Sequence, residues 1–454
     1  MNKYPILAKE MMLHITPEGG TLYTGPVPLQ TLNRPAADIL SLCDGRHSLD
    51  EICGMLAKKY NDSIERVRDL VINFSKKSEE RGNILFTNGE MFEKPIIGGN
   101  KNFWAPIAIT VEITSQCDLS CIHCYAEAGA RKRNEVSFEK WIKVLDGFHR
   151  AGTRLISITG GDPLAYPHIF QILDFCEDKF KVRLLTSGYR VNKDIVEKLS
   201  RYKNLEMIQV SLDGPDKETH DYIRGKKGSF EKATNAIRLL SEVGILTHVG
   251  MMAFRLNKDK IEDTIKLADK LGANVFAVGR VISLGRATKH DLSLTVDEMM
   301  SIGRDIEKFS QKYSHKNFNV RTKDNLKIEL PLPSGDNEEK SIKEEILMKQ
   351  NELLKIIGGN CGAGYRSMFI NSIGVIKSCN LWDYTIGDVS KQSVEEILKS
   401  IHTQFCKDLK APNSEMCSDC GRIYLCFGCH AHADIYSNNA THCKWKEQLI
   451  CTPH

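Results

Sequence analysis

Three closely spaced cysteines follow a stretch of apolar residues that is typical of a buried strand. Cys117, Cys121 and Cys124 have the spacing Cys-x3-Cys-x2-Cys and come directly after the segment from Ile107 to Ile113. Three thiolates can bind three irons of a [4Fe–4S] cube and leave the fourth iron open to a substrate. A structural zinc site needs a fourth protein ligand, and no further cysteine or suitably spaced histidine follows Cys124. The motif therefore favours an iron–sulfur site.

The composition is that of a globular protein of two or three domains. Of the 454 residues, 41% are hydrophobic and 26% charged, and the net charge of +4 gives no strong case for nucleic acid or an anionic membrane. The sequence has no secretion signal and no run of about 18 uncharged apolar residues. We therefore expect a cytoplasmic protein without a membrane partner. In a reducing compartment its 15 cysteines are expected to bind metal rather than to form disulfides.

Strands and helices are expected to alternate from residue 104 to residue 310. Each apolar, strand-like segment precedes an amphipathic helical one, and this repetition predicts an α/β fold with a parallel sheet. The expected strands are 107–113, 154–159, 183–186, 207–212, 246–252 and 275–282. In parallel barrels the chemistry gathers at the carboxyl ends of the strands, and the cysteine motif falls at such an end.

The cysteine motif at the end of the first strand resembles the signature of radical S-adenosylmethionine (SAM) enzymes. The resemblance implies that the six repeats form the partial (β/α)6 barrel of that family. It also implies that SAM binds the open iron, and that one electron cleaves SAM to a 5′-deoxyadenosyl radical.

Further motifs after the later strands resemble SAM-binding elements of the same family. The run from Thr159 to Pro163 resembles a Gly-Gly-Glu-Pro loop with Asp162 in place of the glutamate, and Ser211-Leu212-Asp213 matches a Ser-x-Asp motif. Arg224 is the candidate for the SAM carboxylate because a guanidinium binds carboxylates bidentately, and an exposed surface ion pair is the alternative. The implied cofactor contacts are Tyr125, Gly160, Gly161, Asp162, Ser187, Ser211, Asp213 and Arg224.

Residues 1–95 are expected to form a small separate domain. Glu18-Gly19-Gly20 predicts a turn between two extended segments. Helical spacing follows over 34–43, then Ser48 with an acidic residue three positions later begins a second helix, and a third helix is expected over 64–77. A hairpin followed by two short helices and a longer one describes a winged helix-turn-helix domain.

The segment from Leu32 to Leu40, with Cys43-Asp44-Gly45 and Ser48 to Ile52 after it, resembles the PqqD-like chaperone of pyrroloquinoline-quinone biosynthesis. Relatives of that chaperone are recognition elements for ribosomally synthesised peptides, so the resemblance implies leader binding by strand addition to the wing sheet. A DNA-reading wing is the alternative. The helix expected over 64–77 carries charges of both signs, whereas a phosphate reader should show a denser basic face, so no nucleic-acid partner is expected.

The C-terminal third divides into a charged segment and a cysteine-rich one. Residues 311–358 are expected to be a linker with a helix over 343–356, and residues 359–454 hold nine cysteines between Cys361 and Cys451. Their spacing resembles the SPASM extension of peptide-modifying radical SAM enzymes, which implies two auxiliary [4Fe–4S] clusters and three clusters in all. The implied ligands are Cys417, Cys420, Cys426 and Cys443 for an outer cluster, and Cys361, Cys379 and Cys429 for an inner one.

Two features of this cysteine pattern leave alternatives open. The gap before Cys429 is two residues rather than the usual three, and a zinc ribbon could use Cys417, Cys420, Cys426 and Cys429. The inner cluster lacks the cysteine that usually precedes the position of Cys361. An open iron there could accept a substrate thiolate, or Cys406 or Cys451 could fill the position.

The three parts together, with the phrase Asn360-Cys361-Gly362-Ala363-Gly364, closely resemble the sactisynthases. The resemblance implies an enzyme that joins a cysteine sulfur to a carbon of another residue in the same precursor peptide. The implied partners are a cysteine-containing precursor bound through its leader and an electron donor of flavodoxin or ferredoxin type. The alternatives are another radical modification of a peptide (carbon–carbon crosslinking, epimerisation or dehydrogenation) and, from another class, a DNA-binding iron–sulfur sensor. Sulfatase maturation is disfavoured because Asn380 stands where those relatives carry an aspartate base.

Overall fold

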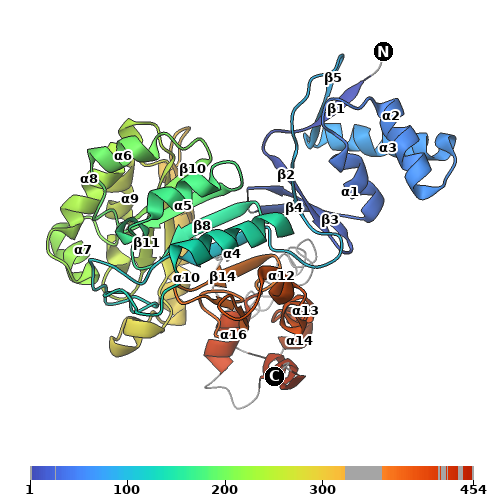
Figure 1. The fold of residues 1–454 in the computed structure, drawn as a ribbon. Helices are drawn as coiled ribbons and strands as arrows, with labels where there is room; N and C mark the ends of the chain where they lie inside the picture. Colours follow the sequence, from blue (N-terminus) through green and yellow to red (C-terminus); the bar gives the residue numbers. More distant parts are fainter. Residues whose placement is uncertain are drawn as a thin grey trace, which may run out of the picture.

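The structure is a computed structural model that describes residues 3–25, 27–322, 360–417, 420, 426, 428–437 and 443–451. The expected linker helix over 343–356 lies outside these residues. Three parts follow one another along the chain: an N-terminal unit with its own sheet, a central sheet covered by helices, and a C-terminal unit rich in short helices (Figure 1).

The N-terminal unit has the winged arrangement that the sequence predicts. A hairpin of β2 (Met11–Thr16) and β3 (Gly19–Thr24) continues into β4 (Val27–Leu32), and the helices α1 (Arg34–Ser41), α2 (Leu49–Tyr60) and α3 (Ile64–Glu80) follow. Three strands were not expected. β1 (Tyr4–Leu7) pairs with β5 (Ile84–Thr87), and β6 (Ile96–Gly99) completes a sheet of order β4-β3-β2-β6.

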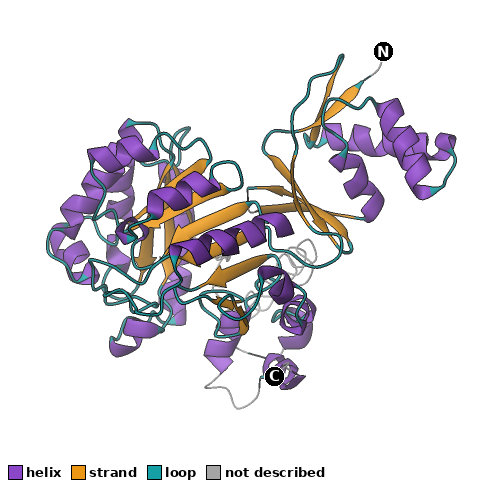
Figure 2. Cartoon of the chain, viewed as in Figure 1, coloured by secondary structure: helices purple, strands orange, loops and turns teal. Residues whose placement is uncertain are grey.

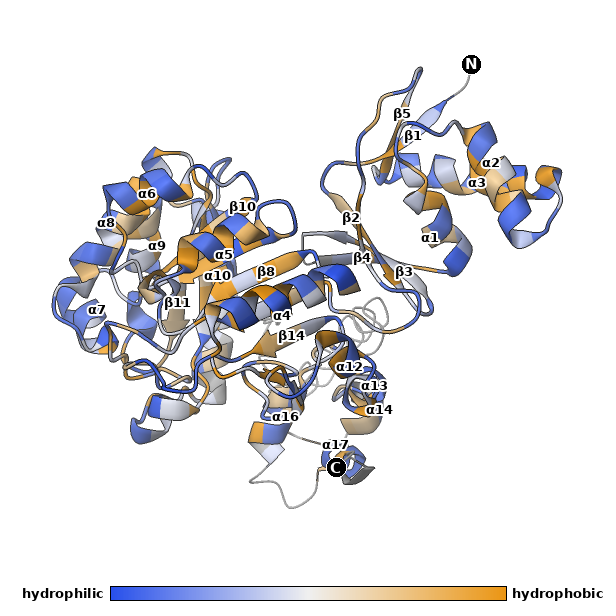
Figure 3. Cartoon of the chain, in the orientation of Figure 1, coloured by the Kyte–Doolittle hydropathy of each residue, from blue (hydrophilic) through white to orange (hydrophobic). Residues whose placement is uncertain are grey.

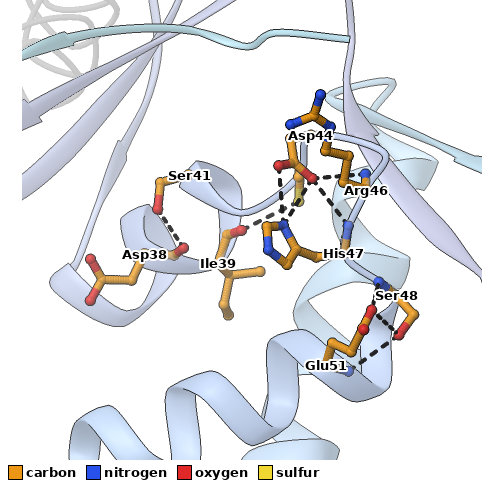
Figure 4. Close-up of polar contacts among 9 residues, drawn as sticks. Asp38, Ile39, Ser41, Asp44, Arg46, His47, Ser48 and Glu51 are labelled. Carbon is orange, nitrogen blue, oxygen red and sulfur yellow. Dashed lines mark hydrogen bonds and ion pairs between the residues drawn. The ribbon is translucent and has the colours of Figure 1, made fainter. Parts of the chain in front are cut away.

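The turn between α1 and α2 is fixed by short-range hydrogen bonds (Figure 4). The carboxylate of Asp44 accepts bonds from the backbone amides of Arg46 and His47. Ser48 and Glu51 form a capping box in which each side chain accepts from the backbone amide of the other residue, at 3.3 and 2.8 Å. These bonds satisfy amides that the first turn of α2 leaves without intrahelical partners, so the expected start of this helix is confirmed.

The six expected strands of the central sheet are present and parallel, which confirms the partial barrel. They are β7 (Ala108–Glu112), β8 (Leu155–Thr159), β9 (Lys181–Thr186), β10 (Leu205–Ser211), β11 (Thr247–Ala253) and β12 (Val275–Arg280). The connecting helices are α4 (Phe138–Ala151), η1 (Pro163–Ala165), α5 (Ile169–Cys176), α6 (Lys193–Leu199), α7 (Lys217–Arg224), α8 (Ser229–Glu242), η2 (Lys258–Lys260), α9 (Ile261–Lys270), η3 (Gly285–Lys289) and α10 (Val296–Tyr313).

The main hydrophobic core lies between the strands and the helices that cover them (Figure 2). Ile109 and Val111 of β7 pack into the same cluster as Trp141 and Phe148 of α4. In Figure 3 the helices over the sheet carry both hydrophilic and hydrophobic residues, as expected of amphipathic helices. Because side chains alternate along a strand, the other face of β7 presents polar residues, including Glu112, to the inside of the barrel.

The sheet extends beyond the six expected strands at both edges. β13 (Asn319–Thr322) lies parallel to β12, so the expectation of a linker was wrong for these residues. This strand is short and, apart from Val320, partly or fully exposed, so it lacks the apolar run that marks a central strand. At the other edge β14 (Ser367–Ile370) lies parallel to β7, and β15 (Val375–Lys377) and β16 (Thr385–Asp388) follow antiparallel. The C-terminal unit is thereby built onto the first barrel strand.

The rest of the C-terminal unit consists of short helices around a small aromatic core. The helices are α12 (Val394–Leu398), α13 (Ile401–Asp408), α14 (Ser414–Cys417), α16 (His430–Ser437), α17 (Lys444–Glu447) and η4 (Gln448–Cys451). Trp382 and Trp445 form the centre of this core, and Cys379, Cys426, Cys429 and Cys443 pack against it. These four cysteines are thus grouped by packing around one pair of tryptophans.

The N-terminal sheet contacts the barrel at the amino ends of the first two barrel strands, β7 and β8. His14 Nε2 lies 2.8 Å from the carbonyl of Ala105, and Arg154 Nε donates to the carbonyl of Ile97 at 2.9 Å. The cysteine motif lies beyond the opposite, carboxyl end of β7. Among the residues that the structure describes, no helix combines the length and the apolar character needed to cross a membrane.

Candidate metal and cofactor site

The cysteine motif forms a loop between β7 and α4 in which the three thiols lie near one another. Burial, together with the negative charges of Asp162, Cys121 and Cys124, raises the pKa of the Cys117 thiol to about 12, against a hydrogen bond from the amide of Leu119. Burial likewise raises the pKa of Cys121. Crowded thiols with such raised pKa values become thiolates only beside a strong positive charge, and metal ions supply that charge. The donor set therefore fits an iron–sulfur cluster.

A buried ion pair stands beside this loop. Arg224 Nη2 lies 2.8 Å from Asp213 Oδ2, and Arg224 Nη1 lies 3.7 Å from the sulfur of Cys121. Asp213 is fully buried and Arg224 is 7% exposed, so the expected alternative of an exposed surface pair is wrong. Burial alone would raise the pKa of Asp213, but the positive charges of Arg224, His123 and His220 hold it below its ordinary value. Contact of Arg224 with a SAM carboxylate stays a prediction.

Two further residues anchor the cysteine loop, and sequence reasoning did not identify them. Arg286 in η3 donates from Nε to the carbonyl of Cys121 at 2.8 Å and from Nη1 to the carbonyl of Ala128 at 2.9 Å. A side chain on the preceding Gly285 would come within 2.4 Å of the carbonyl oxygen of Tyr125. Both residues lie about 160 positions along the chain from the loop, and no local pattern marks such a contact.

The glycine loop after β8 packs directly on the cysteine loop. A Cβ atom on Gly160 would lie 2.3 Å from the carbonyl oxygen of Thr114, and one on Gly161 would lie 2.3 Å from that of Gln116. Gly160 also has a φ of +145°. Glycine is therefore required for this close backbone approach. The expected contact of these backbone groups with SAM stays a prediction.

The carboxylate of Asp162 binds the neighbouring loop. It accepts hydrogen bonds from Thr186 Oγ1 at 2.9 Å, from the amide and the hydroxyl of Ser187, and from the amide of Leu164. Asp162 is only 2% exposed. Asp162 occupies the position of the glutamate in the Gly-Gly-Glu-Pro loop of the family. Its shorter side chain therefore connects the β8 loop to the β9 loop through hydrogen bonds and positions Ser187. Ser211 is the last residue of β10, the strand next to β9, and Asp213 follows it by two residues.

Tyr125 connects the barrel with the C-terminal unit. Its hydroxyl donates to Glu112 Oε1 at 3.0 Å, and burial followed by the charge of Glu112 raises the pKa of Tyr125 well above its ordinary value, against a hydrogen bond with Asn380. Glu112 is 8% exposed, and burial raises its pKa. Sequence reasoning missed Glu112 because it assigned the whole segment 107–113 to an apolar strand.

The three cysteines assigned to the inner cluster lie together. Burial raises the pKa values of Cys379 and Cys429 to about 11, and the charge of Cys429 contributes to the rise at Cys379. The charge of Cys361 likewise raises the pKa of Cys429, and the charge of Cys379 raises the pKa of Cys361. These residues come from three separate segments of the sequence, so only the fold brings them into one group.

The amino end of α16 points backbone amides at the inner group. Hydrogen bonds from the amides of Ala431 and His432 lower the pKa of Cys429, and one from the amide of His430 lowers that of Cys361, both against the larger effect of burial. Amides at a helix amino terminus favour negative charge, and hydrogen bonds to sulfur tune iron–sulfur clusters. This arrangement suits an anionic cluster.

The four cysteines assigned to the outer cluster form a second group. Burial, together with the charges of Cys420, Cys443, Cys417 and Cys429, raises the pKa of Cys426 to about 12. Burial raises the pKa of Cys417, and the charges of Cys420 and Cys443 add to this effect against the charge of Lys444. Cys443 therefore shares the environment of Cys417 and Cys420, but the charge of Cys429 also acts on Cys426, so the choice between Cys443 and Cys429 stays a prediction.

A single metal ion would require a compact arrangement of side chains around it. Within the described ranges, no three His, Cys, Asp or Glu side chains converge closely enough to hold one metal ion. A [4Fe–4S] cube instead takes one thiolate at each of several separate irons, and therefore spreads its ligands more widely than the four-ligand shell of zinc.

Comparison with known families supports this site. The radical SAM superfamily model matches residues 111–268, the coenzyme PQQ synthesis protein D (PqqD) model matches residues 17–84, and the model of the iron-sulfur cluster-binding domain SPASM matches residues 361–421. The three matches follow the three parts of the fold.

Individual relatives are similar over the same parts. The chain is 27% identical to the antilisterial bacteriocin subtilosin biosynthesis protein AlbA of Bacillus subtilis, over 98% of this chain and 97% of that protein. It is 27% identical to the sporulation killing factor maturation protein SkfB of Bacillus subtilis, over 69% of each chain. The crystal structure of Streptococcus suis SuiB bound to S-adenosylmethionine has the same fold, with a TM-score of 0.66 at 17% identity, and the likeness covers 94% of this chain and 96% of that one. The chain is therefore a radical SAM/SPASM enzyme with a PqqD-like N-terminal domain.

Proposed function

We propose that this enzyme matures a ribosomally synthesised peptide by forming intramolecular thioether crosslinks from a cysteine sulfur to a carbon of an acceptor residue. The observation that carries the proposal is the combination, in one chain, of a PqqD-like unit, a radical SAM barrel and a SPASM unit, similar along 98% of its length to a protein of subtilosin biosynthesis. When bound, SAM and the [4Fe–4S] clusters would supply hydrogen abstraction by a 5′-deoxyadenosyl radical and acceptance of the remaining electron.

The N-terminal unit would bind the leader of the precursor. Eight of the thirteen exposed large hydrophobic side chains of the described residues belong to this unit. They are Leu29, Met55, Tyr60, Ile64, Leu70, Leu85, Met91 and Phe92. Exposed apolar side chains that gather on one small unit favour docking of a partner, and a peptide leader is the partner that the PqqD-like match suggests.

The edge strand β4 offers a place for strand addition. It pairs only with β3 within the described sheet, so its outer edge carries backbone groups that a leader strand could bond. Gln30 of β4 accepts a hydrogen bond from Arg81 at the end of α3, which places the helix beside this edge. Arg66 and Arg68 of α3 form ion pairs with Asp62 and Asp50, so this helix lacks the basic face that DNA binding needs.

The barrel would hold the peptide between the cysteine loop and the C-terminal unit. Tyr125 follows Cys124, and its partner Asn380 follows Cys379, so this hydrogen-bonded contact joins the SAM-site loop to the inner cysteine group. Asn380 cannot accept a proton at neutral pH, which favours crosslinking over the alcohol oxidation of sulfatase maturation. Closure of the partial barrel around the bound peptide would keep a substrate radical from water.

Mass spectrometry tests the reaction. The enzyme would be reconstituted anaerobically and incubated with SAM, dithionite and a cysteine-rich precursor encoded next to its gene. We expect loss of two hydrogens for each crosslink together with loss of one alkylatable thiol. An unchanged peptide mass in spite of 5′-deoxyadenosine formation would contradict the proposal for that peptide. A mass loss with every thiol still alkylatable would point to a different peptide modification.

A matched pair of variants tests leader docking. Leu29→Glu on β4 and Leu246→Glu on the barrel change side chains of similar exposure, 41% and 43%. Loss of a docked leucine costs about 1.5 kcal/mol or more, so Leu29→Glu should raise the Kd for the precursor about tenfold or more, measured by fluorescence anisotropy. Leu246→Glu should leave the Kd unchanged. Equal effects of the two variants would place the leader elsewhere.

A further inference from the structure

One buried amide locks the loop that carries Cys361 to helix α13. The side-chain Nδ2 of Asn360 lies within 3.2 Å of the carbonyl oxygens of Cys406 and Lys407 and 2.9 Å from that of Leu409. Its Oδ1 accepts from the amide of Gly362 at 2.9 Å. Asn360 is 2% exposed, so both ends of this amide hold the last turn of α13 against the cysteine loop.

The thiol of Cys406 faces that loop. Cys406 is 1% exposed. Its sulfur packs so closely on Gly364, which has a φ of +94°, that a Cβ atom on this glycine would lie only 2.5 Å from it. Burial followed by the charges of Cys361 and Cys379 raises the pKa of Cys406. Cys406 therefore belongs to the edge of the main core, with its sulfur against the loop that carries the more exposed Cys361.

The other cysteines are accounted for elsewhere. Cys43 and Cys53 lie in the core of the N-terminal unit, and Cys176 lies in the core between α5 and the sheet. The cysteines of the SAM loop act on one another, and Cys426 of the outer group is acted on by its own group and by Cys429. The side chain of Cys451 is not among those that the structure describes. Among the described cysteines outside the assigned groups, Cys406 is thus the one whose sulfur lies against the Cys361 loop and whose carbonyl that loop binds.

We propose that Cys406 is the fourth protein ligand of the inner auxiliary cluster, in place of the cysteine that is missing before Cys361. The proposal rests on the cluster content of the proposed function. Binding would form one sulfur–iron bond and release the thiol proton to solvent. With four thiolate ligands the inner cluster is closed, so it would accept electrons, and the thiol of the precursor would react without first binding iron there.

The experiment needs a protein in which only the auxiliary clusters remain. Replacement of Cys117, Cys121 and Cys124 by alanine removes the open iron of the SAM site, and this background is reconstituted anaerobically with iron and sulfide. ¹³C-labelled cyanide is the probe because it binds an iron that lacks a protein ligand, and pulsed electron paramagnetic resonance of the reduced clusters detects its ¹³C coupling.

We expect no coupling while Cys406 is intact, and a clear coupling after Cys406→Ala at unchanged iron content. Cys176→Ala, which removes another buried thiol, should behave as the intact background. Coupling of equal strength with and without Cys406 would overturn the proposal.

Two further variants keep the test decisive if Cys406→Ala loses its cluster. Cys406→Ser offers an oxygen ligand, so it should retain iron but shift the g-values of the inner cluster, and an unshifted spectrum would overturn the proposal. Cys451→Ser should leave the spectrum unchanged, whereas a shift there and none at Cys406 would assign the ligand to Cys451. No peptide enters these measurements, so their outcome is independent of whether thioethers are formed.

Discussion

At the scale of single residues, the site depends on charges that are buried and mutually paired. Asp213 and Arg224 are both nearly inaccessible to water and lie 2.8 Å apart, with Cys121 as the second neighbour of the guanidinium. Removal of one partner of such a pair leaves an uncompensated charge away from water, which costs far more than loss of a surface pair. The integrity of the SAM-site loop should therefore depend on Asp213.

Asp213→Asn should destabilise the cluster-free protein by about 3 kcal/mol, measured by urea unfolding under anaerobic conditions. Pairing lowers the pKa of Asp213. The stabilisation by this pair is therefore present at pH 7 and is lost as the pH falls below the pKa of aspartate in the unfolded chain, roughly 4. The control Asp263→Asn breaks an exposed pair with Lys266 and should have little effect. Equal losses in the two variants would mean that the buried pair contributes nothing special.

At the scale of elements, a close contact between two helices adds to the shared sheet in holding the C-terminal unit to the barrel. A Cβ atom on Gly147 of α4 would lie 2.9 Å from Cγ2 of Val394 in α12. Gly303 of α10 is also inside a helix, but a Cβ atom there would meet nothing within 4 Å. The two glycines therefore separate the effect of packing from that of helix propensity.

Gly147→Ala should be neutral to destabilising, because overpacking costs about 1–3 kcal/mol and alanine regains only about 1 kcal/mol of helix propensity. Gly303→Ala should stabilise by about 0.5–1 kcal/mol. Addition of Val394→Ala to Gly147→Ala should show a favourable coupling in a double-mutant cycle of unfolding free energies. If both alanines stabilise equally, α4 and α12 are not tightly packed.

At the scale of the whole molecule, the N-terminal unit is attached to the opposite end of the barrel from the cysteine loop. His14 and Arg154 make the contact at the amino ends of the strands, while Cys117 follows the carboxyl end of β7. The five residues of β7 span roughly 17 Å at about 3.3 Å each. A precursor bound through its leader, as proposed, would have to cover at least this distance before its modified residue reaches the site.

The contact between these units should weaken in acid. Burial, with contributions from Arg154 and Arg366, lowers the pKa of His14 to about 4 in spite of its bond to Ala105. Between pH 6.5 and 4, His14 is therefore protonated in the unfolded chain but neutral in the folded chain. The free energy of unfolding falls in this window by up to about 3 kcal/mol.

His14→Gln keeps a neutral donor and should reduce the loss of unfolding midpoint between pH 7 and pH 5 relative to the wild type. His315→Gln changes an exposed histidine and should leave the wild-type difference intact. The proposed origin of the acid sensitivity fails if His14→Gln shows the wild-type difference in full.

The sequence by itself determined whatever depends on neighbours along the chain. Alternating apolar segments specified the parallel strands, because burial and strand period act on adjacent residues. Ser48 and Glu51 specified the start of α2, and the spacing of Cys117, Cys121 and Cys124 specified the type of site, since both depend on offsets of three or four residues.

Only the tertiary structure decided how distant segments meet. The contact of Cys406 with the Cys361 loop, the bonds of Asp162 to the β9 loop and the anchoring of Cys121 by Arg286 each join residues far apart in sequence. The strand β13 likewise owes its place to pairing with β12 rather than to its own apolar character. Such contacts arise from packing of complete elements, which local residue patterns do not encode.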